Sequence, residues 1–177
     1  MPNKFTLSIT FLLFIFCISL NGQDDKDWKI VAYYPLDGDG KDLGKFKNSG
    51  ELLGTPKLVE NRIDEMEAIE FDGNDWVECS PHPLNIKNNV SISLWVKTND
   101  EETKTATLFG KYNPEEFRGF NILMNYGKVQ IFGRDGTPPN KEKRRRNYRG
   151  SGKSTTMIAD GEWHHIVGII ELSLIHI

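Results

Sequence analysis

The feature that most constrains this chain is a strict two-residue alternation over residues 90–96. Apolar Val90, Ile92, Leu94 and Val96 alternate there with Ser91, Ser93 and Trp95. In a β-strand, successive side chains point to opposite faces of the sheet, whereas a helix repeats about every 3.6 residues. The alternation therefore predicts a strand that turns one face toward an apolar core.

Shorter segments of the same kind occur along the chain. They are residues 30–35, 68–71, 76–79, 120–124, 128–132 and 163–170. Turn signals separate them, and Asn125–Gly127 predicts a tight hairpin between two of the segments. No stretch has the pattern of an amphipathic helix, so we expect an all-β, antiparallel β-sandwich. The length of 177 residues suits one domain and excludes a TIM barrel.

The N-terminus has the composition of a secretory signal. Lys4 supplies a positive start, and residues 5–23 carry no charge. We place cleavage after Gly22, so that residues 1–22 form the signal peptide and residues 23–27 a short acidic linker. The alternative is an uncleaved membrane anchor, because the uncharged run approaches the ~20 residues that span a bilayer. Either way, we expect a secreted or cell-surface protein.

Four segments resemble, in order, the landmarks of the LamG-like jelly-roll domains. Val31–Gly38 resembles their opening strand, Ala68–Val77 a strand with an Asp-Gly turn, Val90–Lys97 a strand ending in Trp-Val-Lys, and Asp160–Val167 the Asp-Gly-x-Trp-His-His strand. The resemblance implies a concanavalin A-like jelly roll of two antiparallel sheets over residues 28–171.

Domains of this family continue beyond the Trp-His-His strand with further strands. Residues 172–177 match nothing in the family, and we interpret them as a tail without family resemblance. We therefore expect the jelly roll to be incomplete, a fragment that lacks C-terminal strands.

Two patterns suggest enzymes, and each lacks an essential residue. Gly150–Thr155 resembles a phosphate-binding loop, but Asn147 stands where its first glycine is needed. Some glucanases of this fold carry Glu-x-Asp-x-x-Glu, and Asp64 and Glu67 match the last two positions. Arg62 stands in place of the nucleophile, and an arginine cannot attack an anomeric carbon. We find no catalytic residues and expect a protein that is not an enzyme.

Aspartates crowd three of the predicted turns. Ca²⁺ takes roughly six to eight oxygens from carboxylates and backbone carbonyls, and turns supply both. The candidate ligands are Asp37, Asp39, Asp42, Asp72, Asp75 and Asp160. Many domains that this one resembles bind calcium, which makes Ca²⁺ the candidate cofactor. The alternative is that aspartate simply favours turns.

Positive charge is concentrated in one segment. Residues 141–149 hold six basic residues and one acidic residue, while the whole chain has a formal charge of −3. The basic residues are Lys141, Lys143, Arg144, Arg145, Arg146 and Arg149. In an exported protein such a segment suits sulfated or carboxylated polysaccharides, since arginine binds these groups with two hydrogen bonds. The alternative is a solvated loop, and we expect no nucleic acid as partner.

The remaining candidate residues are aromatic, cysteine and asparagine side chains. We expect Trp76, Trp95 and Trp163 in the core, because each lies in a predicted strand. Cys79, the only cysteine that follows the predicted signal, is expected to be buried in a strand. Tyr112, Tyr126 and Tyr148 are candidates for stacking on sugars, and Asn89 is a glycosylation site if the protein is eukaryotic.

These observations favour an exported, non-catalytic module that recognises glycans or extracellular proteins, with calcium as a candidate cofactor. Two alternatives stay open. One is part of a secreted polysaccharide-acting enzyme, a glycoside hydrolase whose catalytic residues lie elsewhere. The other is a structural adhesion domain that binds protein through its loops or a sheet edge. A membrane partner follows only if the N-terminal segment is an uncleaved anchor.

Overall fold

Strands make up all of the regular structure in the part of the chain that the computed structural model describes. That part comprises residues 13–17, 29–63, 66–79, 90–113, 115–116, 118–135, 151–170 and 175–176. The strands are β1 (Leu13–Cys17), β2 (Lys29–Tyr34), β3 (Gly50–Leu53), β4 (Lys57–Glu60), β5 (Glu67–Glu70), β6 (Trp76–Cys79), β7 (Val90–Lys97), β8 (Ala106–Asn113), β9 (Arg118–Asn125), β10 (Lys128–Asp135), β11 (Ser151–Met157), β12 (Trp163–Ile170) and β13 (Ile175–His176). No helix in the described residues is long and apolar enough to cross a membrane.

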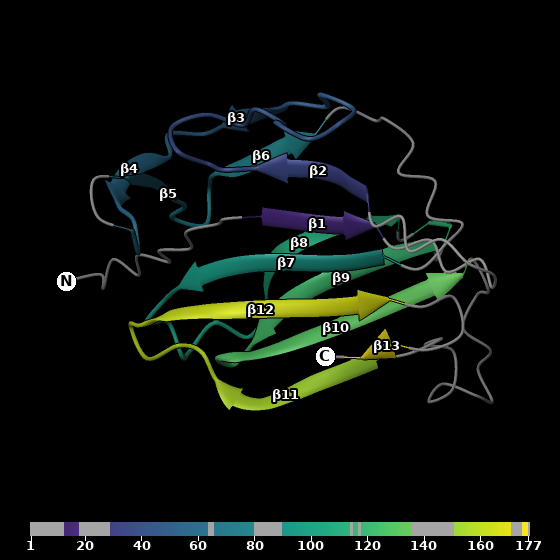
Figure 1. Cartoon of the computed structure of the whole chain (residues 1–177). Helices are drawn as coiled ribbons and strands as arrows, with labels where there is room; N and C mark the ends of the chain where they lie inside the picture. Colours follow the sequence, from purple (N-terminus) through teal and green to yellow (C-terminus); the bar gives the residue numbers. More distant parts are fainter. Residues whose placement is uncertain are drawn as a thin grey trace, which may run out of the picture.

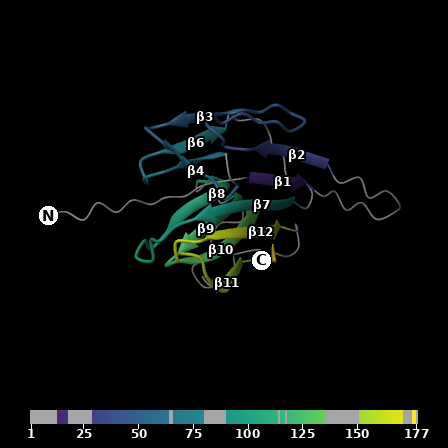
Figure 2. The same ribbon diagram turned by 60° about the vertical axis from the view of Figure 1, so that its left-hand side comes forward.

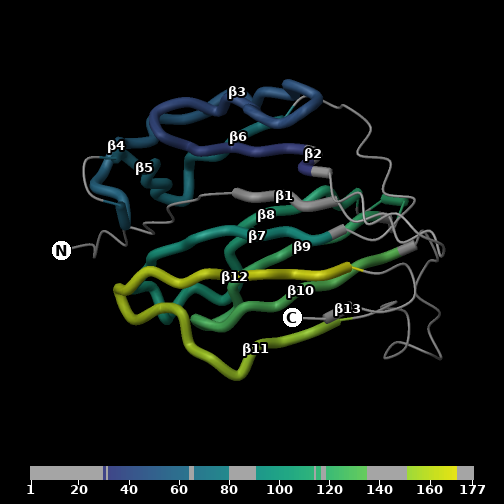
Figure 3. The backbone as a smooth tube through the Cα atoms, viewed as in Figure 1, coloured from purple at the N-terminus to yellow at the C-terminus, as the bar shows by residue number. Residues whose placement is uncertain are grey.

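These strands form two larger sheets and two two-stranded ribbons (Figure 1). One sheet has the order β13-β12-β7-β1-β2, and the other has the order β11-β10-β9-β8. The ribbons β3–β6 and β4–β5 lie together on the β2 side of the molecule (Figure 3). All the described pairs are antiparallel, which confirms the expected all-β antiparallel fold.

The core lies between the two larger sheets, where β7 and β12 cover β9 and β10 (Figures 1 and 2). Ile92, Leu94 and Val96 of β7 are fully buried against Ile122 and Ile131 of the facing sheet. These are the apolar positions of the alternation in β7. Their burial confirms that the two-residue pattern turns one face of this strand toward a core.

The hairpin between β9 and β10 confirms the turn that the sequence predicts. Tyr126 and Gly127 connect the two strands, and their φ angles are 47° and 67°. Two successive positive φ angles match the twist of an antiparallel pair in a two-residue loop. A side chain at Gly127 would also collide with Met157 of β11, because its Cβ would lie 2.2 Å from the sulfur.

Several strands were not expected from the sequence. β3 and β4 are only four residues long, β8 and β11 contain several polar residues, and none of the four shows a clear two-residue alternation in the sequence. β11 contains most of Gly150–Thr155, so this segment is extended and does not form a phosphate loop followed by a helix. β1 lies within the predicted signal peptide, and β13 lies within residues 172–177, where it pairs with Ile169 and Ile170.

Candidate functional site

The outer face of the β7–β12 pair carries a different set of side chains from the core face. Ile166 is 5% exposed and faces the core, whereas the next residue, Val167, is 43% exposed on the outer side. Trp163 and His165 alternate with the core-facing residues of β12 and share the outer face with Val167. Trp95 of β7 lies opposite His165 in the register and belongs to the same outer face.

Four side chains meet on this face, and we call them the Trp95 cluster: Arg62, Ser93, Trp95 and His165. The rings of Trp95 and His165 are stacked, with centroids 4.8 Å apart and planes at 19°. The guanidinium carbon of Arg62 lies 4.2 Å from the Trp95 ring centroid, a cation–π distance. His165 Nε2 lies 2.7 Å from Ser93 Oγ, which fixes the imidazole against the sheet.

The loop between β4 and β5 brings Arg62 to this face. Asn61 Oδ1 accepts a hydrogen bond from the Arg62 amide at 2.7 Å, and Asn61 Nδ2 donates to the Glu67 carbonyl at 2.8 Å. The Asn61 amide also donates to the Met66 carbonyl at 3.1 Å. These bonds close the base of the loop, so Arg62 projects from a fixed backbone.

The Trp95 cluster combines a cation, an imidazole and an indole on the outer face of the β7–β12 pair, where His165 is exposed, Arg62 and Trp95 are partly exposed, and Ser93 is buried. Arg62 as a residue is partly exposed, although its Nε is buried and has no hydrogen-bond partner among the described residues. Guanidinium and imidazole groups hydrogen-bond hydroxyls and carboxylates, and aromatic rings pack on apolar faces. The cluster therefore places hydrogen-bonding groups next to an aromatic ring.

Sequence reasoning missed the Trp95 cluster and interpreted two of its members differently. The expectation that Trp76, Trp95 and Trp163 are core residues is wrong: Trp76 is 54% exposed, and the other two are partly exposed. Their place in strands is correct, but each takes an outward position of the alternation. The register of β7 and β12 would have revealed the pairing of Trp95 with His165, since directly opposed residues in a sheet interact.

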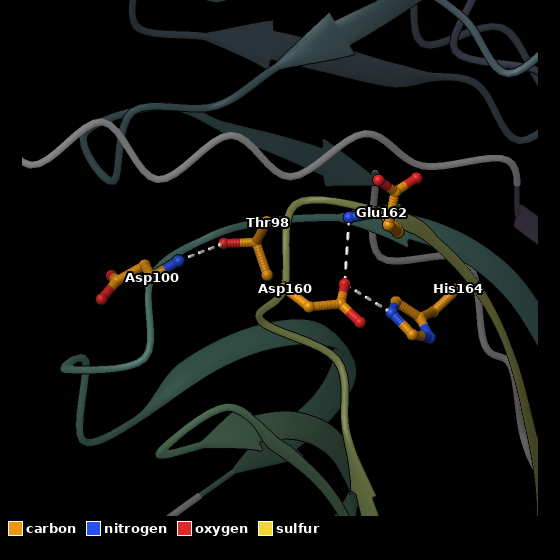
Figure 4. Close-up of polar contacts among 5 residues, drawn as sticks. All are labelled: Thr98, Asp100, Asp160, Glu162 and His164. Atoms are coloured by element: carbon orange, nitrogen blue, oxygen red, sulfur yellow. Dashed lines mark hydrogen bonds and ion pairs between the residues drawn. The ribbon is translucent and has the colours of Figure 1, made fainter.

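A second set of polar side chains lies at the start of β12, where the loop that precedes this strand meets the loop that follows β7 (Figure 4). Asp160 Oδ1 lies 2.9 Å from His164 Nε2 and accepts a hydrogen bond from the Glu162 amide at 3.0 Å. The hydrogen bond with His164, and then that with the Glu162 amide, holds the pKa of Asp160 below its usual value. The Gly161 amide donates to the carbonyl of buried Thr98, which ties the two loops together.

Asp42, one of the predicted calcium ligands, is buried and holds its own loop together. Its Oδ1 accepts hydrogen bonds from the Tyr33 and Gly44 amides, and its Oδ2 accepts one from the Asn48 amide. The residue is only 2% exposed. Both carboxylate oxygens therefore already serve the turn that joins β2 to β3.

The other predicted calcium ligands are divided among three turns, with Asp37 and Asp39 in the first, Asp72 and Asp75 in the second, and Asp160 in the third. Asp37 is exposed, and Asp39 forms an ion pair with Lys41. Asp75 accepts hydrogen bonds from the Thr55 and Asp72 amides, and Asp72 accepts one from the Asn74 amide. The described residues contain no group of three His, Cys, Asp or Glu side chains that could hold a metal ion. Calcium binding by these turns stays a prediction.

Several predicted site residues lie outside the described part of the chain. They are Lys141, Lys143, Arg144, Arg145, Arg146 and Arg149 of the basic segment, Asn89 and Tyr148. Tyr126 is 53% exposed at its hairpin. Tyr112 makes an edge contact with Phe132, with ring centroids 5.4 Å apart. Neither tyrosine lies in the Trp95 cluster.

Cys79 occupies a strand, as expected, but the expectation that it is buried is wrong. It is the last residue of β6 and is exposed as a whole. Its thiol is nevertheless partly shielded from water beside Tyr34, and this desolvation raises the pKa of the thiol. β6 pairs with β3 in a two-stranded ribbon, which is why a strand position here does not imply burial.

Comparison with known proteins yields one match. A family model described as the concanavalin A-like lectin/glucanases superfamily matches residues 71–177, more than half of the chain. No curated protein and no solved structure matches the chain. The matched segment includes β7, β12 and residues 172–177, while Arg62 lies before it.

Proposed function

The chain belongs to the concanavalin A-like lectin/glucanase superfamily, and on that premise we propose that it is a non-catalytic glycan-binding module of an exported protein. Membership supports a carbohydrate- or protein-binding module in general. The fold alone does not choose between these ligands, because one fold hosts many functions. The choice of a glycan rests on the chemistry of the outer face.

The observation that carries the proposal is the Trp95 cluster. A sugar presents both hydroxyl groups and an apolar face of C–H groups, so its binding site combines hydrogen-bond donors with an aromatic surface. Arg62 and His165 supply the donors next to the indole of Trp95. Trp163 lies further along the same face of β12 and extends the aromatic surface.

The functional groups of the Trp95 cluster favour a binding role over hydrolysis. A glycosidase of the usual kind needs two carboxyl groups about 5–10 Å apart on either side of the scissile bond. The described members of the Trp95 cluster are a guanidinium, a hydroxyl, an indole and an imidazole. The Ser93–His165 pair lacks a described carboxylate to orient the imidazole, which a nucleophilic serine requires.

Export is the second part of the proposal, and the sequence supports it. The charge-free residues 5–23 follow Lys4, as in a secretory signal. Exported glycan-binding modules meet polysaccharides outside the cell, and the basic residues 141–149 would add attraction for acidic ones. The contribution of that segment is separate from the Trp95 cluster and has its own test in the salt dependence of binding.

An array of neutral and acidic oligosaccharides, probed with the full chain, tests the proposal. We expect binding to a subset of glycans, followed by a loss of about tenfold or more in affinity for Arg62→Gln. Arg134→Gln is the matched control, because Arg134 also lies over an aromatic ring, at 5.8 Å from Tyr112, but on the other sheet. Measured by calorimetry, Arg134→Gln should bind like the unchanged chain.

Three results would contradict the proposal in different ways. Binding to no glycan, together with binding to an extracellular matrix protein, would favour the adhesion alternative. Equal affinity of the two arginine variants would place the glycan site away from the Trp95 cluster. Release of reducing ends from a bound polysaccharide would show that the chain is an enzyme.

A further inference from the structure

β1 occupies an interior position in the five-stranded sheet, between β2 and β7 (Figure 1). Its five residues pair antiparallel with β2, from Leu13 opposite Tyr34 to Cys17 opposite Lys29. Phe14, Ile15 and Phe16 pair antiparallel with Ser93, Ile92 and Ser91 of β7 on the other side. β1 is therefore the strand through which β2 joins the rest of the sheet.

β2 depends on this connection because it is an edge strand with β1 as its described partner in the sheet. It nevertheless contributes Ala32 and Tyr34, each 4% exposed, to the same core cluster as Ile92 of β7. Neighbouring strands lie about 4.8 Å apart, so removal of β1 leaves β2 and β7 roughly 10 Å apart. That gap exposes unpaired N–H and C=O groups on two strands and opens the core beneath them.

The residues of β1 also belong to the predicted signal peptide. Leu13–Cys17 reads Leu-Phe-Ile-Phe-Cys and lies inside the charge-free run that is expected to be cut off after Gly22. The same five residues thus complete the sheet in the uncut chain and leave with the signal in the exported one. The following inference rests on the export part of the proposed function and not on glycan binding.

We propose that the gap between β2 and β7 is a strand-acceptor site, which Leu13–Cys17 fills in the uncut chain and an extended apolar strand of a partner protein fills after the segment is removed. The occupant seen in the structure defines the ligand. It is a segment of about five residues, apolar throughout, that runs antiparallel to both neighbours. Backbone hydrogen bonds to two strands supply the affinity, as in other cases of strand addition.

The register of β1 against its two neighbours restricts further which strands can fill the gap. A ligand strand pairs with Ser91–Ser93 on one side and follows an irregularity on the other, where the partner in β2 shifts from Ala32 to Ile30. Since both edges of the ligand are hydrogen-bonded, a proline at its centre removes a donor and is not tolerated there.

The test uses the full chain, cut only after it has folded. A site-specific protease sequence is inserted between Gly22 and Gln23, the purified chain is nicked, and β1 remains bound without a covalent link. A fluorescent peptide is then added that carries the Leu13–Cys17 sequence between lysine pairs, with Cys17→Ser. Its incorporation is followed by anisotropy and gel filtration at rising urea concentrations below the unfolding transition. Because the cut is made in vitro, the result does not depend on export.

We expect the peptide to replace the nicked segment at one per chain and to protect the amides of Ser91–Ser93 from hydrogen exchange. The same peptide with Ile15→Pro should bind at least about tenfold more weakly. The uncut chain should also bind at least about tenfold more weakly, because its own segment competes at a high effective concentration.

Three outcomes would overturn the proposal. One is no incorporation at any urea concentration, whether or not the nicked chain keeps its circular dichroism spectrum. Another is equal binding of the proline peptide, which would indicate non-specific hydrophobic adsorption. The third is equal binding to the cut and uncut chains. Glycan binding, measured on the same nicked sample, reports separately on the Trp95 cluster.

Discussion

The core face and the outer face of β7 and β12 arise from one backbone register but have different chemical content. On the core face Ile92, Leu94 and Val96 are fully buried. On the outer face Trp95 is partly exposed and His165 is exposed, and the two rings stack across the strands. The register of β7 against β12, which buries the apolar residues of one face, therefore also fixes which side chains lie opposite one another on the other face.

Leu94→Ala makes the largest change to the core face and tests how far the two faces are separate. Leu94 is completely buried, so the shorter side chain leaves a cavity and should lower the free energy of unfolding by about 2–5 kcal/mol. Urea unfolding measures the effect. Lys97→Ala, at an exposed outer position of the same strand, is the control and should stay within about 0.5 kcal/mol. Equal losses for the two variants would show that the faces are not energetically distinct.

Gly168→Ala tests the core face by adding volume. A Cβ at Gly168 would lie 2.8 Å from Ile131 Cδ1 and 3.1 Å from Ile122 Cδ1. These atoms are the ends of flexible side chains and can move, so we expect a loss of roughly 1–2 kcal/mol. Thermal unfolding measures the loss, and Val167→Thr on the outer face is the control, within about 0.5 kcal/mol. A stabilised Gly168→Ala variant would mean that the core has unfilled space here.

The core face of this pair could be predicted from the sequence, whereas the outer cluster could not. Two-residue alternation shows which residues of β7 share a face, and burial of Ile92 and Leu94 follows from their apolar character. The Trp95 cluster depends on the register of β7 against β12 and on Arg62, which comes from a loop before β5. Neither property leaves a local pattern in the sequence.

The aspartates show a second limit of sequence reasoning. Both Asp42 and Asp160 lie in predicted turns, and the sequence alone does not distinguish them as candidate calcium ligands. The structure gives them different surroundings: buried Asp42 accepts hydrogen bonds from three backbone amides, one in β2 and two in its own loop, whereas Asp160 is exposed beside His164. A preference of aspartate for turns predicts the position of both but the partners of neither.

Ser93→Ala measures the energetic value of the polar contact on the outer face. Loss of the bond between Ser93 Oγ and His165 Nε2 should cost about 0.5–1.5 kcal/mol. A double-mutant cycle with His165→Ala isolates the contact, with unfolding in urea as the readout, and should give a coupling energy in the same range. A coupling energy near zero would mean that the ring stack with Trp95 alone holds the imidazole in place.

Asp160→Asn should have the smallest effect. It tests the contact at the start of β12 between a core-side residue, His164, and the exposed loop that precedes the strand. His164 occupies a core-side position of β12 but is bonded to exposed Asp160. Because His164 and the Glu162 amide hold the pKa of Asp160 below its usual value of about 3.9, the carboxylate stabilises the fold above that pH. This contribution is lost as the pH falls through the lowered pKa, whereas Asp160→Asn has no such pH dependence.

The measurement is the difference in urea midpoint between the unchanged chain and Asp160→Asn from about pH 7 to pH 2, with NMR titration of the Asp160 carboxyl. The difference should shrink below about pH 4. In His164→Gln the pKa of Asp160 should rise, because the first of its two hydrogen bonds is lost, while the Glu162 amide still holds it below the usual value. An unchanged titration in His164→Gln would instead assign the lowered pKa of Asp160 to the turn alone, and the contact between His164 and Asp160 would then contribute nothing to it.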